Sequence, residues 1–367
     1  MTYRWGDLIS LEYGKPVADK ENVNGRHPVY GTNGQIGTTN MLPLCPHASV
    51  IIGRKGAYRG VHYSEKPFSV IDTAFYLKSR VNDLDLKWAY YKFLTYDINR
   101  MDSGSAIPST DRYEIYSIPV ELPSLGEQQV IAATLSALDD KIANNKKINH
   151  HLEQMARAIY NEALISSVSA DGVIFDVAEI NANTYSVREN WSFVNYLDTS
   201  SITQGVISEI QLITDINDLP SRARRKVNVG DIVFSTVRPN QRHFGIISTP
   251  LDNMLVSTGF SVIHSTNSAV SNEYLYLLLS SDAVIEQLQA VAEQSVSTYP
   301  SIKPSDIGNL GVFIPTDGDD LNCTLHVLFE KMANANDENR RLAELRDTLL
   351  PRLMSGELSV ADLGNAK

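Results

Sequence analysis

The chain has 367 residues, which is enough for two or three domains that each bury a core. Hydrophobic residues make up 43% of it and charged residues 20%, as in an ordinary soluble protein, and no apolar run approaches the roughly 18 residues that span a bilayer. The net charge of -11 by itself argues against nucleic-acid binding, because such proteins usually carry a positive field. The cysteines Cys45 and Cys323 have no metal-ligand spacing, and the start MTYRWGDLIS has no apolar signal segment, which together predict reduced thiols in the cytoplasm.

The first part of the chain reads as a mixed α/β region in which strands dominate. The runs SVIIG (49–53) and SVIDTAFYL (69–77) are β-branched or aromatic and are bounded by turn residues, which is typical of strands. GTNGQIGTTN (31–40) is rich in turn residues, and one short helix is predicted near 86–97.

Residues 126–164 predict a long two-sided helix. Apolar or small residues recur with alternating spacings of four and three, which is the heptad pattern of a coiled coil. These seam positions are Ile131, Leu135, Leu138, Ile142, Asn145, Asn149, Leu152, Ala156, Ile159 and Ala163. Such a helix would be roughly 58 Å long if unbroken, and its seam needs a partner.

The next region repeats the character of the first. DIVFSTV (231–237) and FSVIHS (260–265) read as strands, STPLDNM (248–254) reads as a turn, and one helix is predicted near 272–288. A second heptad seam follows it. Its positions are Leu325, Leu328, Met332, Ala335, Asn339, Leu342 and Leu349.

The two halves of the chain also match each other in order. SGSAIPSTDRYEIYSIPVELP (103–123) aligns without gaps with SVSTYPSIKPSDIGNLGVFIP (295–315), and WGDLISL (5–11) resembles IFDVAEI (174–180), with Asp7 over Asp176. KIANNKKINHHLEQM overlays KMANANDENRRLAEL in the same way. The predicted architecture is therefore globular, helix, globular, helix. An antiparallel pairing of the helices would relate the halves by a pseudo-twofold axis.

Asparagine interrupts both seams. Asn149 and Asn339 occupy equivalent positions, where a buried asparagine would fix register at a cost in stability. The alternative is that these residues face solvent. Asn145 lies over Ala335, so its polarity is not shared and is interpreted as incidental.

Several motifs in combination resemble the specificity subunit of Type I restriction-modification systems. They are PSLGEQQVIAATLSALDDKIANNKKINHHLEQMARAIY (123–160), YGTNGQIG (30–37), WSFVNYLDTSSITQG (191–205) and LRDTLLPRLMSGEL (345–358). The resemblance covers essentially the whole chain. One departure is that Pro315 is followed by TDGDDLNCTL and not by a Glu-Gln start, so the role of Glu127 and Gln128 is expected only once.

The resemblance implies an α+β fold in which two mixed α/β target recognition domains are separated by an antiparallel two-helix coiled coil. It divides this chain into recognition domains at 1–122 and 167–315, a central helix at 123–166, a C-terminal helix at 316–358 and a tail at 359–367. Each domain would read one half of a split double-stranded DNA site. The helices would set the spacing and dock two methyltransferase subunits, which restriction subunits join. Glu127, Gln128 and the seam residues, Leu342 included, are the candidates for coiled-coil packing and subunit docking.

The best candidates for DNA contact lie in equivalent strand-turn positions. GRKGAYRG (53–60) and STVRPNQRHFG (235–245) place arginine and amide side chains among small residues, and such side chains distinguish base edges in the major groove. The candidates are Arg54, Lys55 and Arg59 in the first half and Arg238, Asn240, Gln241, Arg242 and His243 in the second. An ordinary charged hairpin is the alternative.

Three further segments are weaker candidates. SRARRK (221–226), with Arg224, Arg225 and Lys226, would contact phosphates or form a solvated loop. YGTNGQIG is a poor dinucleotide fingerprint and is interpreted as a turn, with Thr32 and Asn33 as possible DNA contacts. The loops 103–109 and 295–301 would bind phosphate or be plain turns. Because basic residues are concentrated in these segments, and because the resemblance implies partner subunits that also bind DNA, the acidic net charge is compatible with DNA binding.

No catalytic or metal-binding motif stands out. The chain lacks an amino-methylation motif, a P-loop, an H-E-x-x-H and a G-x-S-x-G, and His150 and His151 point in different directions on a helix. We therefore expect a non-catalytic DNA reader without a cofactor, with S-adenosylmethionine and ATP bound by partner subunits. A coiled-coil scaffold that ignores DNA is the second hypothesis, and a self-sufficient DNA methyltransferase is the third.

Overall fold

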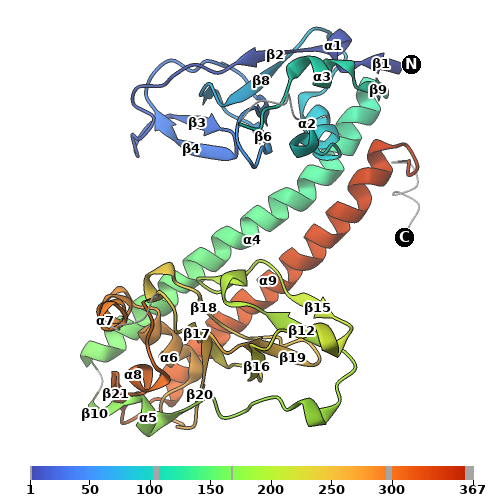
Figure 1. Ribbon diagram of the computed structural model, residues 1–367. Helices are drawn as coiled ribbons and strands as arrows, with labels where there is room; N and C mark the ends of the chain where they lie inside the picture. Colours follow the sequence, from blue (N-terminus) through green and yellow to red (C-terminus); the bar gives the residue numbers. More distant parts are fainter. Residues whose placement is uncertain (1, 102–106, 167, 295–299, 360–367) are drawn as a thin grey trace. The chain divides into compact units, whose positions relative to one another are not determined.

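The computed structural model describes residues 2–101, 107–166, 168–294 and 300–359 (Figure 1). The chain forms two compact units. The first unit combines residues 1–143 with 339–367, and the second consists of residues 144–338. Each unit therefore contains a globular part together with a stretch of both long helices.

The sheets of the first unit are small and mostly antiparallel. A four-stranded sheet has the order β2-β8-β5-β6, a three-stranded sheet has the order β4-β3-β7, and β1 pairs with β9. The strands are β1 (Thr2–Arg4), β2 (Ile9–Tyr13), β3 (His27–Gly31), β4 (Gly34–Thr39), β5 (Ser49–Gly53), β6 (Val61–Ser64), β7 (Ser69–Val70), β8 (Ala74–Ser79) and β9 (Pro119–Glu121). All five residues of β5 are buried, which accounts for its uninterrupted apolar sequence.

Short helices cover this sheet. They are α1 (Trp5–Leu8), α2 (Leu86–Leu94), the 3-10 turn η1 (Ile98–Arg100) and α3 (Arg112–Ser117). Asp85 caps α2 by accepting a hydrogen bond from the Trp88 N–H at 2.7 Å. Trp5 is fully buried and stacks on Phe93 with ring centroids 4.4 Å apart, which fixes α1 against α2.

The second unit repeats this topology with additional strands. Its main sheet has the order β11-β20-β17-β18, a further sheet has the order β15-β12-β19-β16, and β10-β21 and β13-β14 form pairs. The strands are β10 (Ser169–Val173), β11 (Ala178–Ile180), β12 (Val194–Leu197), β13 (Ile202–Thr203), β14 (Val206–Ile207), β15 (Gln211–Ile213), β16 (Ala223–Lys226), β17 (Ile232–Ser235), β18 (Phe244–Ile246), β19 (Met254–Ser257), β20 (Phe260–Ser265) and β21 (Gly311–Pro315).

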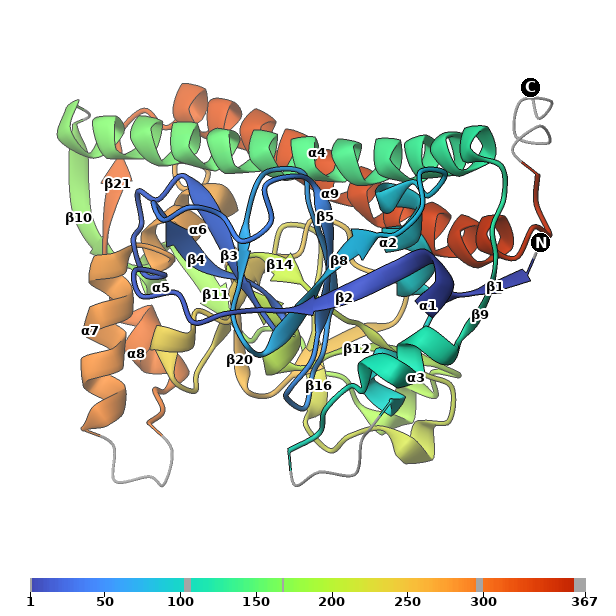
Figure 2. The ribbon, with the colours of Figure 1, turned by 90° about the horizontal axis from the view of Figure 1, so that it is seen from above.

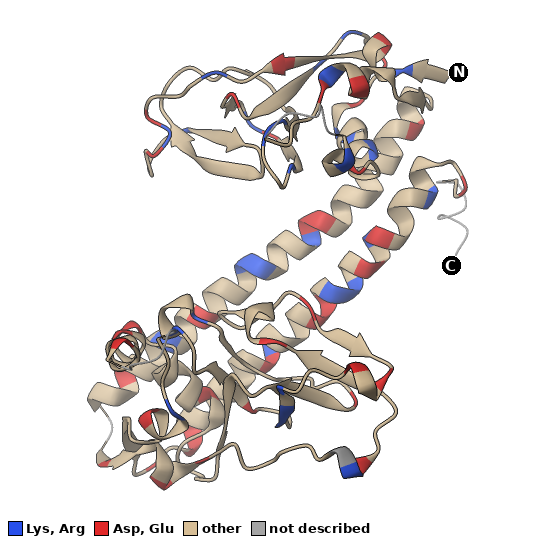
Figure 3. Cartoon of the chain, in the orientation of Figure 1, with Lys and Arg blue, Asp and Glu red and all other residues tan. Residues whose placement is uncertain are grey.

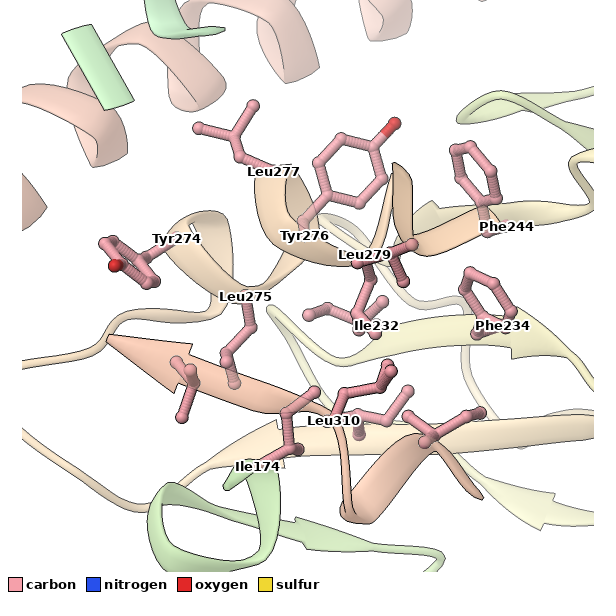
Figure 4. Close-up of a cluster of buried hydrophobic side chains, with 14 of the residues drawn as sticks. Ile174, Ile232, Phe234, Phe244, Tyr274, Leu275, Tyr276, Leu277, Leu279 and Leu310 are labelled. Atoms are coloured by element: carbon pink, nitrogen blue, oxygen red, sulfur yellow. The ribbon is translucent and has the colours of Figure 1, made fainter. Parts of the chain in front are cut away.

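The helices of the second unit are more numerous than expected. The helix predicted near 272–288 is two helices, because Ser281 caps a new helix through the Val284 N–H. The elements are α5 (Ile174–Val177), α6 (Asn272–Leu279), α7 (Asp282–Glu293), α8 (Pro304–Gly308), and the 3-10 turns η2 (Val187–Glu189), η3 (Thr199–Ser201), η4 (Ile216–Asp218) and η5 (Pro239–Gln241). Figure 4 shows Leu279 of α6 beside Ile232 of the main sheet, and Leu275 belongs to the same buried cluster.

The internal repeat predicted from the sequence is present in the structure. The four-stranded sheets β2-β8-β5-β6 and β11-β20-β17-β18 have the same order, and each unit pairs its first strand with the strand before its long helix. Asp7 and Asp176 occupy the same place, since each accepts a hydrogen bond from the backbone three residues earlier, at 2.9 and 2.8 Å. The four-residue helices α1 and α5 were not predicted, because one turn carries no periodicity.

The long helices are α4 (Leu125–Ser166) and α9 (Asp319–Met354), and they run antiparallel (Figure 2). Within the first unit, Asp139 accepts a hydrogen bond from Arg346 at 2.8 Å. Within the second, Asn145 bonds Glu338 at 2.6 Å, and Leu325 and Leu328 share a core with Ala156. Residue numbers rise along one helix as they fall along the other. Both seams predicted from the heptads are buried or half-buried, which confirms the predicted coiled-coil pairing.

Of the seam asparagines, Asn145 and Asn149 bond across the helix pair, whereas Asn339 is half-buried and its Oδ1 is unpaired among the described residues. Asn149 donates to the Met332 carbonyl at 3.3 Å and to Asn336 Oδ1 at 2.7 Å, both on α9. Asn145, which the sequence comparison interpreted as incidental, is only 3% exposed and bonds across the pair to Glu338. That interpretation was wrong, because alignment with Ala335 compares repeat positions and says nothing about which residue faces it. Hydrogen bonds across the seam favour a role in register.

Burial of tyrosines gives the protein a specific alkaline sensitivity. Burial raises the pKa of Tyr274 to about 12, and burial also raises the pKa values of Tyr160 and Tyr276. A tyrosine with a raised pKa stabilises the fold below its unfolded value of about 10, and this stabilisation is lost as pH rises toward the folded value. We expect the free energy of unfolding to fall above pH ~10. Urea unfolding across pH, with Tyr274→Phe showing a shallower dependence, checks this.

Candidate DNA interface

In the first unit, the candidate residues after β5 form a turn held by two other segments. The backbone N–H groups of Arg54 and Lys55 donate to the Thr73 carbonyl at 2.8 and 3.1 Å. Lys55 forms a β-bridge with Ser109, and the Gly56 N–H donates to the Pro108 carbonyl at 3.0 Å. The turn is therefore anchored by its backbone, and this leaves the side chains of Arg54 and Lys55 half-exposed.

The second unit has the same turn after β17. Val237 forms a β-bridge with Ser301, and the Arg238 N–H donates to the Pro300 carbonyl at 3.0 Å, as Gly56 does to Pro108. Gly56 has φ +123° and Arg238 has φ +48°, so this turn requires positive φ in both units. Glycine adopts such a φ without cost, whereas arginine is strained there by roughly 1–3 kcal/mol. Retention of a long cationic side chain at a glycine position points to a use for that side chain.

The other candidates of the second turn differ in availability. Arg238, Asn240 and Gln241 are exposed. Arg242 instead forms an ion pair with Asp282 of α7, and the His243 ring bonds the Ile202 carbonyl at 2.6 Å. A hollow of about 290 Å³ lies between η5 and α7, and its mixed lining includes Arg242 together with Glu286 and Glu293. Arg242 would have to leave Asp282 to reach a phosphate.

Two candidates of the first unit are not presented to solvent. Arg59 is 3% exposed, and its guanidinium donates to the carbonyls of Ile98 and Asn99 at 3.3 and 2.7 Å. The Thr32 hydroxyl is also buried, against the glycine-rich turn. We remove both from the predicted DNA-contact set, because the Arg59 guanidinium and the Thr32 hydroxyl are buried. Asn33 stays exposed at the tip of the β3–β4 hairpin.

The basic run SRARRK is a strand and not a loop. Ala223–Lys226 form β16, which pairs with β19 and, through Arg225, with Thr184. Arg224, Arg225 and Lys226 are all half-buried, and Lys226 is ion-paired with Glu189 and lies over the Trp191 ring. Lys226 is therefore less available to bind a phosphate. The loop serines Ser103, Ser105, Ser295 and Ser297 lie outside the described residues.

Charged side chains of both signs occur throughout the described part of the chain. Lys and Arg are interspersed with Asp and Glu along both long helices (Figure 3). Within the described ranges, no group of three or more His, Cys, Asp or Glu side chains is placed to hold a metal ion. No helix of the same ranges is both long enough and apolar enough to cross a membrane.

Comparison with known proteins gives a consistent answer. Residues 1–154 match the family described as Type I restriction modification DNA specificity domain. The MjaIX specificity subunit of Methanocaldococcus jannaschii is 24% identical over 307 residues, which cover 76% of this chain and 70% of that protein. The HindI specificity subunit of Haemophilus influenzae is 35% identical over 103 residues, but these span only 28% of this chain and 22% of that protein.

A solved structure matches the fold over nearly its full length. The S subunit of the Type I restriction-modification system from M. genitalium aligns with a TM-score of 0.64 over 96% of both chains, at 16% identity. The chain is therefore similar to Type I specificity subunits, by the family match over residues 1–154 and by its fold over nearly its full length.

The Glu-Gln motif at the start of α4 has a structural explanation. Glu127 completes a capping box, because its carboxylate accepts from the Ser124 N–H at 2.9 Å. Gln128 is fully buried, donates to the Asp83 and Pro123 carbonyls at 2.9 Å, and accepts from the Asp85 N–H at 2.8 Å. Gln128 therefore joins α4 to the start of α2. Since it has no exposed surface, it is not a docking residue.

In the second unit, a different amide residue joins the long helix to the start of a short helix. Asn322 of α9 accepts from the Ser271 N–H at 3.2 Å and donates to the Ser268 carbonyl at 3.0 Å. Ser271 caps α6 as Asp85 caps α2. The expectation that this role exists only once was wrong. A shorter amide one turn into the helix performs it, and sequence matching to Glu-Gln could not detect that.

Two further family-like motifs meet in the first unit. Asp139 of LDDKI accepts from Tyr91 of α2 at 2.6 Å and from Arg346 of LRDTLLPRLMSGEL at 2.8 Å. Lys92 of α2 donates to the Met354 carbonyl at 2.8 Å, at the end of α9. The helix then ends through Gly356, whose φ of +74° suits glycine. These motifs join the helix pair to the globular part of the unit.

Proposed function

We propose that this chain is the DNA-recognition subunit of a Type I restriction-modification complex, with each unit reading one half of a split, asymmetric site. The observation that carries the proposal is the repeated turn, which has the same backbone bonds in both units but different exposed polar residues. To read two different half-sites, the two units need the same backbone turn but different side chains on it. The scaffold hypothesis does not explain why a strained arginine is kept in this turn.

The proposal extends to partners. Two methyltransferase subunits would dock on α4 and α9, restriction subunits would join that core, and S-adenosylmethionine and ATP would be bound by those partners. This chain would contribute recognition and no catalysis, and it would act in the cytoplasm. The net charge of -11 is compatible with this, because the partners would supply part of the grip on the DNA.

The decisive experiment uses the chain assembled with its methyltransferase subunits. The complex should methylate one split site, with binding that weakens as salt rises, because phosphate contacts release counterions. A scaffold would show no salt-dependent DNA binding. Methylation that ignores sequence would refute the proposed function.

Arg238→Ala should relax one half-site and leave the other intact. Loss of a base-contacting arginine costs about 1–3 kcal/mol of discrimination. Methylation of duplexes carrying single substitutions throughout both half-sites measures this. Arg188→Ala, an exposed arginine of the same unit, serves as the control and should change neither half. Equal loss at both halves would indicate a folding defect and not recognition.

A further inference from the structure

A cluster of arginine and tyrosine side chains lies beside the turn of the first unit, and Arg54 is the only member that the sequence pattern indicated. The Tyr13 ring, at the end of β2, has the Arg54 guanidinium carbon 4.8 Å from its centroid and that of Arg112 at 5.0 Å. Arg112 also lies over the Tyr113 ring at 5.0 Å. We name Tyr13, Arg54, Arg112 and Tyr113 the arginine–tyrosine cluster.

The positive charge of this cluster has no acidic partner among the described residues. Neither arginine is ion-paired to a carboxylate there: Arg54 donates to the Asp72 carbonyl at 2.9 Å, and Arg112 to the Tyr113 hydroxyl at 3.1 Å. Because both lie near one ring, the two cations are within about a Debye length, ~10 Å at 0.1 M salt. An anionic ligand would relieve this repulsion.

The cluster is open to a ligand. Tyr13 is 45% exposed and Tyr113 63%, so the rings are not part of the core. Both arginines are half-exposed, and stacking on tyrosine holds their planar groups in place while edge N–H donors stay available. An arginine fixed in this way loses little side-chain entropy when it binds a guanine edge with two hydrogen bonds.

The second unit keeps the frame of this site but not its chemistry. Asp7 and Asp176 occupy equivalent positions, and the residues at the same distance after them are Tyr13 and Ala182. The matched bridges place Arg54 opposite Thr236, and the gap-free repeat places Arg112 opposite Pro304. The arginine–tyrosine cluster therefore belongs to the first unit alone, whereas the second unit presents Arg238 at the corresponding turn.

We infer that the arginine–tyrosine cluster determines base specificity at the half-site read by the first unit, with Arg54 and Arg112 each contacting a base edge in the major groove of double-stranded DNA. This inference rests on the proposed function. The inference extends the proposed function by assigning the two half-sites to chemically different surfaces. Tyr13 acts as a positioning residue that holds both guanidinium groups.

The test compares Arg54→Gln, Arg112→Gln and Arg112→Lys in the assembled methyltransferase complex, on duplexes substituted at every position of both half-sites. Each Gln variant should lower discrimination at one base pair by about 5- to 150-fold, in the half-site that Arg238→Ala leaves intact. Arg112→Lys should retain the salt dependence of binding but lose the discrimination, because lysine lacks the planar fork.

Lys87→Gln is the matched control. Lys87 also lies over a tyrosine ring, Tyr63 at 5.7 Å, but it is ion-paired with Glu65 at 2.7 Å. The Lys87→Gln variant should show unchanged discrimination at both half-sites. Normal reading of the second half-site in every variant reports an intact fold.

Three results would overturn the inference. Unchanged discrimination in both Gln variants, on a complex that reads a split site, would reject the cluster and spare the proposed function. Uniform weakening on all sequences, with a salt slope reduced by about one, would make these arginines phosphate contacts. A wild-type complex without sequence preference would reject both proposals together.

Discussion

Gln128→Ala should lower the free energy of unfolding by about 3 kcal/mol, because it leaves three part-buried backbone groups without their hydrogen-bond partner at about 1–3 kcal/mol each, partly offset by relaxation and by access of water. Those groups are the Asp85 N–H and the carbonyls of Asp83 and Pro123. The loss should appear as faster amide exchange at the start of α2 and α4, together with a lower urea midpoint of the full chain.

Gln129→Ala is the neighbouring control, since Gln129 is exposed and its replacement should change stability by less than about 0.5 kcal/mol. Gln128→Glu adds a second comparison. It keeps the length of the side chain but replaces two donated hydrogen bonds with repulsion from the same carbonyls, so it should be at least as damaging as alanine. Equal stability of the Gln128 and Gln129 variants would contradict the bridging role.

Asp139→Arg should destabilise the first unit by about 3 kcal/mol, because it removes an acceptor shared by Tyr91 and Arg346 and places two cations side by side. The side chains of Asp139 and Arg346 are 31% and 29% exposed, so solvent screens part of this effect. Combining it with Arg346→Asp should restore part of the loss, which a double-mutant cycle of unfolding free energies measures.

Lys146→Glu controls for a charge change on the same helix at an exposed position. Its effect should stay within about 0.5 kcal/mol. If the Asp139 and Arg346 variants prove additive, the two family-like motifs do not stabilise each other, and their contact in the folded chain has no energetic weight.

The helix pair was predictable because its signal is periodic and long. Both seams and the antiparallel pairing followed from heptads and from the repeat. The environment of Asn145 was not predictable, because whether an asparagine meets Glu338 or solvent depends on the phase of one helix against the other. Comparing a sequence with its own repeat identifies equivalent positions, but it does not show which residues of the two helices face each other.

The candidate interface was predictable in position and less so in its residues. The turn at Lys55 and its equivalent at Val237 were located correctly, since strand ends and glycines mark them. Arg59 turned inward, because carbonyls at 98 and 99 accept its donors. Arg112 was missed although it directly follows the repeated loop, because its proximity to Tyr13 arises only when distant segments fold together.

The division of the chain has a consequence for synthesis. The second unit is one continuous stretch, residues 144–338, whereas the first needs residues 339–367 to complete it. Ile131 and Leu135 share a core with Leu353 and Met354, which are synthesised after the whole second unit. The first unit therefore finishes folding after the second. Until Leu353 and Met354 are synthesised, an apolar face of α4 stays uncovered, which exposes the nascent protein to aggregation.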